Sequence, residues 1–268
     1  MRALLGSVVL GAIVIAAISA APGGTSARSD VLPRRHIVVA ELFTSEGCSS
    51  CPPADALLQR IAAASPLDGV EVLGLEEHVD YWDNLGWRDP FSSSGFTRRQ
   101  SDYDARVFRT GDIYTPQLVV DGAFDAIGSD ARAVRDAIVK AAARPAADVR
   151  VAATADGNHA RADVHVDIPA SVDRRKDADI VVAVVEDGLA SHVDRGENRG
   201  RTLAHAAVVR SMKAIGAVKS GASSGDAVAD LTLDSGWQLA HLRVIAFVQE
   251  RSTLRILGAN GSTLYGRR

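Results

Sequence analysis

Cysteine is nearly absent from this sequence: Cys48 and Cys51 are the only two among 268 residues. A structural zinc site takes four ligands, usually including a second C-x-x-C or a pair of histidines, and the chain has no second cysteine pair. The sequence therefore disfavours zinc at these cysteines. A structural disulfide, a reactive pair and two ordinary buried thiols are the remaining interpretations.

A strong charge of one sign is also absent. The formal net charge is −3 and no basic tract occurs, so the sequence offers no electrostatic surface for a nucleic acid. We find no internal repeat, and no Ser/His/Asp constellation can be argued from spacing. The two cysteines are therefore the main chemical signal in the chain.

Long apolar runs are absent except at the start, where residues 4–21 follow Arg2. Pro22 and two glycines break this run, and the small residues 25–27 suit a cleavage site. We expect 1–27 to be a signal peptide or an N-terminal membrane anchor. The rest of the chain is then exported to the periplasm or another extracytoplasmic compartment, where disulfides form and persist.

The two cysteines lie between an apolar run at 37–43 and a helical pattern at 54–64. This order predicts a strand, a tight turn and a helix, with both sulfurs at the helix N-terminus. The unpaired N–H groups and dipole of a helix N-terminus stabilise a thiolate and lower a thiol pKa. We interpret Cys48 as the outer, nucleophilic sulfur and Cys51 as the resolving thiol.

From residue 36 to residue 145 the pattern alternates between strand and helix. Strands are expected at 70–75, 118–120 and 123–127, with a hairpin turn at Asp121-Gly122, and a helix is expected at 131–143. Such alternation predicts a parallel core sheet, to which the hairpin adds an antiparallel edge.

The region 148–262 has a different pattern. About seven short strands separated by polar turns predict an antiparallel β-sandwich; the candidate strands are 149–154, 161–168, 180–185, 203–212, 231–233, 242–249 and 253–258. Residues 196–201 are charged and glycine-rich but lack phosphate-loop spacing. We interpret them as an ordinary connecting loop, and a loop that contacts a partner is the alternative. We expect His205 and Arg210 on the solvent face of their strand.

Six segments resemble a bacterial family of secreted thioredoxin-like proteins of unknown function. They are SEGCSSCPPAD, HVDYWDNLGWRDPF, TRRQ, YTPQLVVDG, GENRGRTLAH and VVR. The resemblance covers about 36–260. It implies an α/β fold in which a thioredoxin-like domain (36–145) precedes the β-sandwich-like domain.

The resemblance also assigns roles to residues outside the C-x-x-C. Pro116 matches the cis-proline that faces the disulfide in thioredoxins, and Thr115 precedes it; both would offer backbone groups to a substrate strand. Many thioredoxins carry a buried acid where this chain has Leu42. Glu41 is one residue earlier, so it points to the opposite face of a strand and is either a proton-transfer group or a structural acid.

An insertion at 78–112 separates the second strand from Pro116. It is rich in aromatic residues, and Tyr81, Trp82 and Trp87 are expected to form a substrate platform near the disulfide, with His78 as a proton shuttle. The alternative is an aromatic plug between domains. Scattered His and Asp residues such as His78, Asp80 and Asp83 do not usually bind a metal, so we expect neither a metal nor a cofactor. A helix is expected at 97–108.

The hypothesis is an exported thiol–disulfide oxidoreductase that acts on protein thiols and disulfides, with a membrane redox partner to recycle it. No nucleic acid is expected as a partner, and membrane contact is expected only through an uncleaved N-terminal segment. The alternative is a non-catalytic envelope binding module in which the thioredoxin scaffold carries a structural disulfide.

Overall fold

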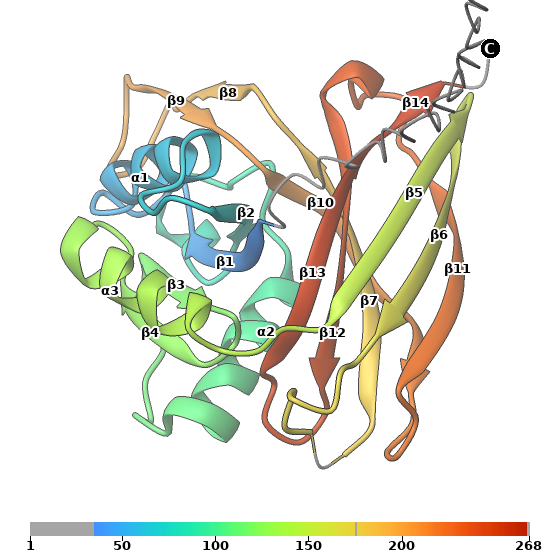
Figure 1. Cartoon of the computed structure of the whole chain (residues 1–268). Helices are drawn as coiled ribbons and strands as arrows, with labels where there is room; N and C mark the ends of the chain where they lie inside the picture. Colours follow the sequence, from blue (N-terminus) through green and yellow to red (C-terminus); the bar gives the residue numbers. More distant parts are fainter. Residues whose placement is uncertain (1–34, 175, 267–268) are drawn as a thin grey trace, which may run out of the picture. The chain divides into compact units, whose positions relative to one another are not determined.

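A computed structural model describes residues 35–174 and 176–266 as a mixed α/β protein (Figure 1). The described residues form one compact unit. An eight-stranded mixed sheet has the order β13-β12-β7-β10-β2-β1-β3-β4, a four-stranded sheet has the order β11-β6-β5-β14, and β8 pairs with β9. The expected signal or anchor segment, 1–27, lies outside the described residues.

The first elements of the chain build the end of the large sheet that carries the cysteines. They are β1 (His36–Thr44), α1 (Pro52–Ala63), β2 (Val70–His78), β3 (Gln117–Val120), β4 (Phe124–Ile127) and α3 (Ala131–Ala142). β1 is parallel to β2 and antiparallel to β3, and β3 pairs with β4 across the predicted turn. These elements agree with the sequence prediction to within a few residues.

The insertion contains η1 (Asp83–Leu85), α2 (Ser94–Tyr103) and the π-helical turn η2 (Asp104–Phe108). The predicted single helix at 97–108 is therefore wrong in its start and its uniformity. The helix begins earlier because the Ser93 hydroxyl accepts a hydrogen bond from Gly95 N at 3.1 Å. The π turn ends at Arg109, whose backbone is left-handed.

The later elements are almost entirely strands. They are β5 (Asp148–Asp156), β6 (His159–Asp167), β7 (Ala178–Glu186), β8 (Leu189–His192), β9 (Thr202–His205), β10 (Val208–Val218), β11 (Ser224–Thr232), the short η3 (Leu239–His241), β12 (Leu242–Glu250), β13 (Ile256–Thr263) and β14 (Tyr265–Gly266). The single strand predicted at 203–212 is two strands, because the chain turns at Ala207, where φ is +58°.

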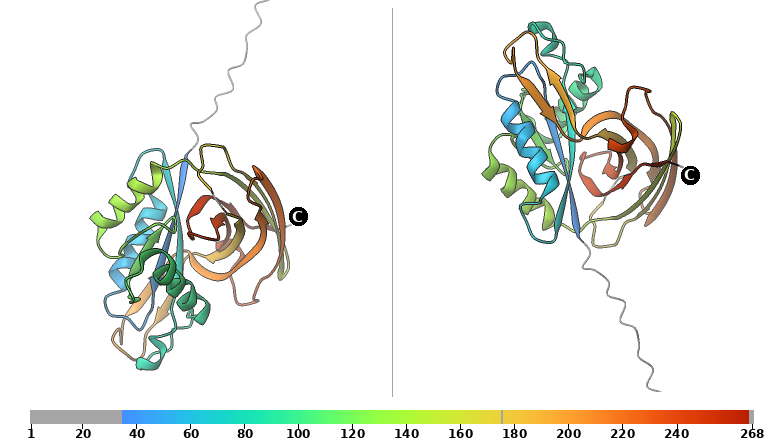
Figure 2. Two further views of the ribbon diagram at one scale, coloured as in Figure 1. Left: turned by 90° about the horizontal axis from the view of Figure 1, so that it is seen from below. Right: turned by 90° about the horizontal axis from the view of Figure 1, so that it is seen from above.

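β1 is buried on both faces. Val38, Ala40 and Leu42 pack against α1 and α3, whereas Val39 belongs to a second core with β7 and β12. Figure 2 shows α1 and α3 on one side of β1 and β2 and most strands of the later region on the other. A third core lies between the four-stranded sheet and β7 and β12.

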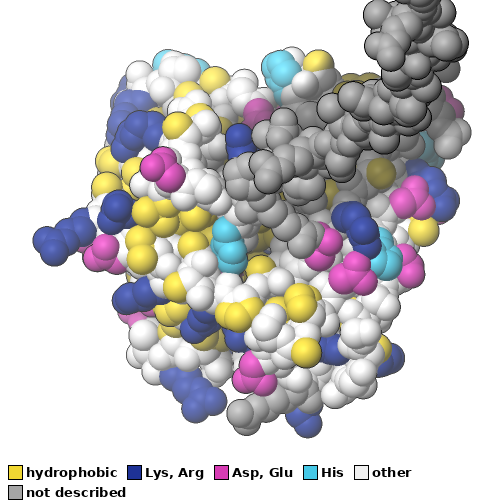
Figure 3. All heavy atoms as spheres, viewed as in Figure 1, with side chains coloured by type: hydrophobic (Ala, Val, Ile, Leu, Met, Phe, Trp, Pro, Cys, Tyr) yellow, Lys and Arg dark blue, Asp and Glu magenta, His cyan; other side chains and the backbone are white. Residues whose placement is uncertain are grey.

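The large sheet joins the two predicted domains, because β10 pairs in parallel with β2 at Val208 and Glu76. Whether 36–145 and 148–262 can each fold alone stays a prediction. On the face seen in Figure 3, positive and negative side chains both occur. Within the described residues, no helix combines the length and the apolar character needed to cross a membrane.

Candidate functional site at the disulfide turn

Cys48 and Cys51 form a disulfide between the end of β1 and the start of α1, with their Cα atoms 5.5 Å apart. Cys51 is the N-cap residue of α1, and its carbonyl accepts hydrogen bonds from the backbone N–H groups of Ala54 and Asp55. Pro52 occupies the first helical position. The predicted order of strand, turn and helix is confirmed.

Both cysteines are fully buried, with 0% of their surface exposed, so the expectation that Cys48 is the outer sulfur is wrong. The loop 193–201 supplies contacts to this turn from about 150 residues away. Asn198 Nδ2 donates to the carbonyls of Glu46 at 2.8 Å and Cys48 at 2.9 Å. Glu197 accepts a hydrogen bond from Ser49 N at 3.0 Å. The charged loop predicted at 196–201 thus binds the cysteine turn of its own chain.

The Thr115–Pro116 peptide bond is cis, as the resemblance implies. The β1–β3 register places Phe43 opposite Gln117, so this dipeptide lies beside the end of β1, where the disulfide turn begins. Trp82 joins the two segments: its Nε1 donates to Thr115 Oγ1 at 2.9 Å, and its Cβ lies beside Gly47.

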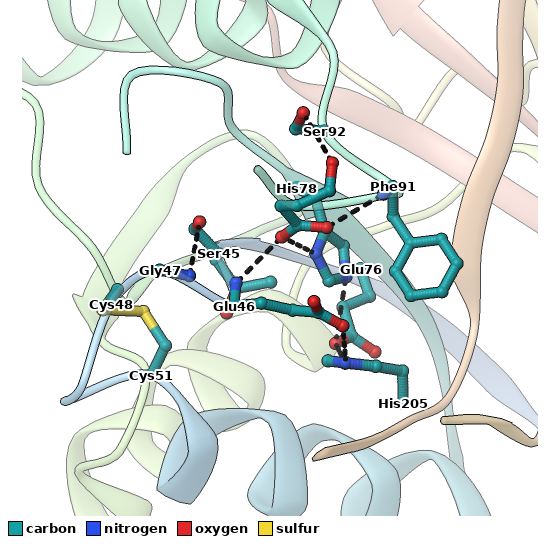
Figure 4. Close-up of polar contacts among 12 residues, drawn as sticks. Ser45, Glu46, Gly47, Cys48, Cys51, Glu76, His78, Phe91, Ser92 and His205 are labelled. Atoms are coloured by element: carbon teal, nitrogen blue, oxygen red, sulfur yellow. Dashed lines mark hydrogen bonds and ion pairs between the residues drawn. A yellow bond between two sulfur atoms is a disulfide. The ribbon is translucent and has the colours of Figure 1, made fainter. Parts of the chain in front are cut away.

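A buried cluster of two imidazoles and three carboxylates adjoins the turn (Figure 4). His78 Nδ1 lies 2.7 Å from Asp89 Oδ2, and its Nε2 lies 3.4 Å from Glu76 Oε1. His205 Nδ1 lies 2.7 Å from the same Glu76 oxygen, and its Nε2 lies 3.1 Å from Glu46 Oε1. The prediction that His205 faces solvent is wrong, because the residue is 1% exposed.

In this cluster the carboxylates stabilise the charged form of the imidazoles, and the imidazoles stabilise the charged form of Glu76. Burial opposes a charged imidazole, but the carboxylates outweigh it: Asp89 holds the pKa of His78 well above 6.5, and Glu46 with Glu76 raises the pKa of His205 to about 9. Burial likewise opposes a charged Glu76, yet the two imidazoles hold its pKa at about 2. The cluster is therefore a compact set of ion pairs beneath the protein surface.

Asp89 and Trp87 connect this cluster to the cysteine turn. Asp89 Oδ2 also accepts a hydrogen bond from Glu46 N at 2.8 Å, and Trp87 Nε1 donates to Glu46 Oε2 at 2.7 Å. The aromatic insertion thus supports the turn with specific hydrogen bonds. Tyr81 OH bonds to Gln100 Oε1 at 3.3 Å. Whether Tyr81, Trp82 or Trp87 contacts a substrate stays a prediction.

Asp55 was not among the predicted site residues. It lies in the first turn of α1, is 4% exposed, and accepts a hydrogen bond from Thr44 Oγ1 at 2.6 Å. Burial, with a smaller contribution from the charge of Glu76, raises the pKa of Asp55 to about 7. Its position four residues after Cys51 places it one helical turn from the disulfide.

Glu41 lies apart from the disulfide residues. It accepts hydrogen bonds from Arg99 Nε and Tyr103 OH, each at 2.5 Å, in a second buried cluster that also holds Glu77. Burial, with the charge of Glu41, raises the pKa of Glu77 well above 4.5. These contacts favour the structural interpretation of Glu41 over proton transfer. His78 and Asp80, which the sequence grouped, also have different partners, because Asp80 bonds to Thr97.

A pocket of about 470 Å³ opens between the insertion and β10. Its lining includes Phe91, Phe96, Arg99, Arg210 and Trp237. The Arg210 guanidinium lies 5.3 Å from the ring centre of Phe91 and 5.2 Å from that of Trp237. Arg210 is thus half-buried between two aromatic rings, and the prediction of a solvent-facing side chain is wrong.

Residues 39–249 match the family described as "Protein of unknown function (DUF1223)". The chain belongs to this family. The matched range contains the disulfide turn, the buried cluster and the loop 193–201, so the DUF1223 family match includes the whole site. No curated protein matches the chain.

Two solved structures resemble this chain over most of its length. A protein of Agrobacterium tumefaciens, solved by a structural genomics consortium, has 26% sequence identity and a TM-score of 0.61, and the match covers 84% of this chain and 92% of that one. HBP35 of Porphyromonas gingivalis has 18% identity and a TM-score of 0.66, covering 86% and 76%. The second likeness concerns the fold alone.

Proposed function

We propose that this protein is an exported thiol–disulfide oxidoreductase with a thioredoxin-like fold around Cys48 and Cys51. The order β1, disulfide turn, α1, β2, β3, β4 and α3, with a proline beside the turn, supports this proposal. The observation that carries it is the disulfide at the N-terminus of α1. A thiolate formed there is stabilised by the unpaired N–H groups and the dipole of the helix.

The exchange proceeds in two displacements. In the reduced protein, the Cys48 thiolate attacks a substrate disulfide, a mixed disulfide forms, and one substrate sulfur leaves as a thiolate. Cys51 then attacks Cys48 Sγ, the second substrate sulfur leaves, and the Cys48–Cys51 disulfide forms. Two electrons pass to the substrate. Starting from the disulfide, the same steps in reverse oxidise a substrate dithiol.

Asp55 is the proton acceptor in this proposal. With a pKa of about 7, its carboxyl group is partly ionised near neutral pH and can take the proton of a cysteine thiol. Because both sulfurs are buried, the loop 193–201 must move before a protein disulfide reaches Cys48. Protein thiols and disulfides outside the cytoplasm are the proposed substrates, and a membrane protein that carries electrons is the proposed recycling partner.

Trapping of mixed disulfides tests this function. In cells that express the full chain, Cys51→Ser should accumulate disulfide-linked adducts that dithiothreitol releases, because Cys48 can attack but no resolving thiol remains. Cys48→Ser is the matched control and should trap nothing. If Cys51→Ser gives no adducts under conditions that export the protein, the exchange proposal is wrong.

The reduction potential gives an independent test in the purified protein. A value between about −120 and −270 mV is typical of exchange catalysts, whereas a value below about −300 mV marks a structural disulfide. Equilibration with glutathione or dithiothreitol buffers, followed by alkylation and mass measurement, gives this value. The oxidising end of the range indicates disulfide formation, and the reducing end indicates a reductase.

The complete burial of the disulfide favours a second candidate, a non-catalytic envelope binding module. In this alternative the disulfide is fixed and the pocket beside Arg210 binds a ligand. The two candidates differ in thiol accessibility. After mild reduction at neutral pH, an exchange catalyst alkylates readily at Cys48, whereas a structural pair resists both the reduction and the alkylation.

A further inference from the structure

One nitrogen atom in the buried cluster is free to bind a ligand. The cluster consists of Glu46, Glu76, His78, Asp89 and His205. Among the described residues, His78 Nε2 makes no hydrogen bond, although the residue is 0% exposed. Its other nitrogen, Nδ1, bonds to Asp89 at 2.7 Å. This bond fixes the ring and places Nε2, which lies 3.4 Å from Glu76 Oε1, beside the His205 ring.

His205 has a matching arrangement on the other side of Glu76. Its Nε2 faces Glu46 Oε1 at 3.1 Å, and its Nδ1 faces Glu76 Oε1 at 2.7 Å. Glu76 Oε1 therefore lies between the two imidazoles. The other nitrogen of each ring faces a second carboxylate, which is Asp89 for His78 and Glu46 for His205. The potential ligand atoms of Glu76, His78 and His205 all lie within 4.8 Å of one another.

We propose that Glu76, His78 and His205 bind a divalent transition-metal ion, and that Asp89 and Glu46 orient the two histidines. Histidines that bind metals generally donate their second N–H to a carboxylate or carbonyl, as both histidines do here. Two imidazoles and one carboxylate form a common ligand set for Zn²⁺ and Fe²⁺.

The distances suit such an ion. Ligands about 2.0–2.1 Å from a tetrahedral zinc lie about 3.3 Å from one another. The His78 Nε2–Glu76 Oε1 separation is 3.4 Å, and the His205 Nδ1–Glu76 Oε1 separation of 2.7 Å needs to widen by about 0.6 Å.

Charge and surroundings also favour a divalent ion with an affinity for nitrogen. Three carboxylates are buried around two imidazoles, and an ion of charge two offsets much of their negative charge. Mg²⁺ and Ca²⁺ prefer sites made of oxygen atoms, so the imidazoles select against them. The Phe91 ring, centred 5.3 Å from His78 and 5.6 Å from His205, shields the site on one side.

Zinc binding by the full chain tests this proposal. Both cysteines are first replaced, as Cys48→Ser and Cys51→Ser, so that no thiolate binds the metal. After treatment with a chelator, addition of ZnCl₂ and removal of excess, we expect about one zinc per chain by elemental analysis, as for a single site. We also expect ZnCl₂ to raise the melting temperature and MgCl₂ to leave it unchanged.

The variants His78→Gln and His205→Gln should each lose the bound zinc and the thermal shift. The matched control is His165→Gln, because His165 is partly exposed and pairs with Asp226 on a different sheet. This variant should bind zinc as the parent does. X-ray absorption of the parent chain, which does not depend on the variants folding, should show two imidazoles on the zinc. Absence of zinc from the parent, or zinc retained by folded His78→Gln and His205→Gln, overturns the proposal.

Discussion

Asp121 shows how one buried carboxyl group can affect the pH dependence of the whole protein. Its Oδ1 accepts a hydrogen bond from Val39 N at 2.8 Å, and the residue is 8% exposed. Burial, with the charge of Glu41, raises the pKa of Asp121 to about 7, against the opposing effects of Val39 N–H and Arg144. In an unfolded chain the pKa of an aspartate is about 3.9.

The folded state therefore binds one more proton at Asp121 than the unfolded state between about pH 4 and 7, and the free energy of unfolding falls as pH rises through this range. Asp121→Asn should remove up to about 1.4 kcal/mol per pH unit from that slope. Asparagine still accepts from Val39 N–H, and it tolerates the left-handed backbone at position 121, where φ is +47°. Urea unfolding of both proteins at pH 5 and pH 8 measures the difference.

Asp136→Asn is the control for this prediction, because it removes the same charge from an exposed position on α3. Its unfolding free energy should keep the pH dependence of the parent protein. Equal slopes for Asp121→Asn and the parent would show that Asp121 is ionised in the folded state throughout this range.

At the scale of single residues, the sequence predicted those features of the site that depend on residues close together along the chain. The cysteine turn and its proline-started helix needed only nearby residues. His205 was misplaced because its polarity was given more weight than its spacing: Leu203, two residues earlier, is buried on the same face of the strand. Asn198 carried no local signal, since its partners are about 150 residues away.

At the scale of elements, the turn between β3 and β4 packs tightly against the loop that contains Leu254. Gly122 has a φ of +61°, and a Cβ added there would lie 2.0 Å from the Leu254 carbonyl oxygen. Gly122→Ala should cost about 2–5 kcal/mol of unfolding free energy, from left-handed strain and from displacement of the facing loop. Denaturant titration measures this cost.

Gly157→Ala is the matched control for the β3–β4 turn. Gly157 has nearly the same φ, +60°, but nothing lies within 4 Å of its added Cβ. This substitution should cost only about 1–2 kcal/mol, from backbone strain alone. Equal costs at the two positions would show that Leu254 moves aside without penalty.

The loop 193–201 bonds to the cysteine turn, and the proposed function requires this loop to move before a substrate reaches the disulfide. Asn198→Ala removes the side-chain hydrogen bonds to the Glu46 and Cys48 carbonyls, each of which contributes about 0.5–1.5 kcal/mol. Because 1.4 kcal/mol is a factor of ten, dithiothreitol should reduce the disulfide roughly tenfold faster. Alkylation at timed intervals after reductant is added measures the rate.

Arg199→Ala changes an exposed side chain in the same loop and serves as the control. Its disulfide should be reduced at the rate of the parent protein. If Asn198→Ala is also reduced at that rate, the loop does not limit access to Cys48.

Strand positions followed from apolar runs, because β1, β2 and β7 are buried on both faces and need continuous hydrophobic sequence. The sequence did not predict turns formed by residue types that rarely occur in turns. Ala207 separates β9 from β10 although alanine gives no signal for a positive φ. The pairing of β10 with β2 was also missed, because sequence patterns define strands but not their distant neighbours.

At the scale of the whole molecule, Arg99 joins the early and late parts of the chain. It contacts Glu41 on β1, Glu77 on β2 and Gln249 on β12. Removal of one partner from a buried ion pair costs about 3–5 kcal/mol, so Arg99→Met should lower the melting temperature by roughly 6–20 °C. Arg98→Met is the control, because Arg98 is exposed and its guanidinium bonds to Ser94, four residues earlier on the same helix.

Calorimetry measures both changes and shows whether unfolding remains one transition. A single transition at a lower temperature for Arg99→Met fits an arginine that stabilises one cooperative unit. Two separated transitions would show that the parts on either side of Arg99 unfold independently. A melting temperature equal to that of Arg98→Met would contradict the expected cost.

The bonding of a distant loop to the cysteine turn has a consequence for synthesis. A ribosome makes Cys48 and Cys51 well before Asn198, the residue that bonds to the Cys48 carbonyl across 150 positions. In a nascent chain that emerges from its N-terminus, the cysteine pair is present while the loop does not yet exist. In the exported protein that we propose, an oxidising enzyme therefore has its freest access during translocation, before residues 193–201 emerge and bond to the turn.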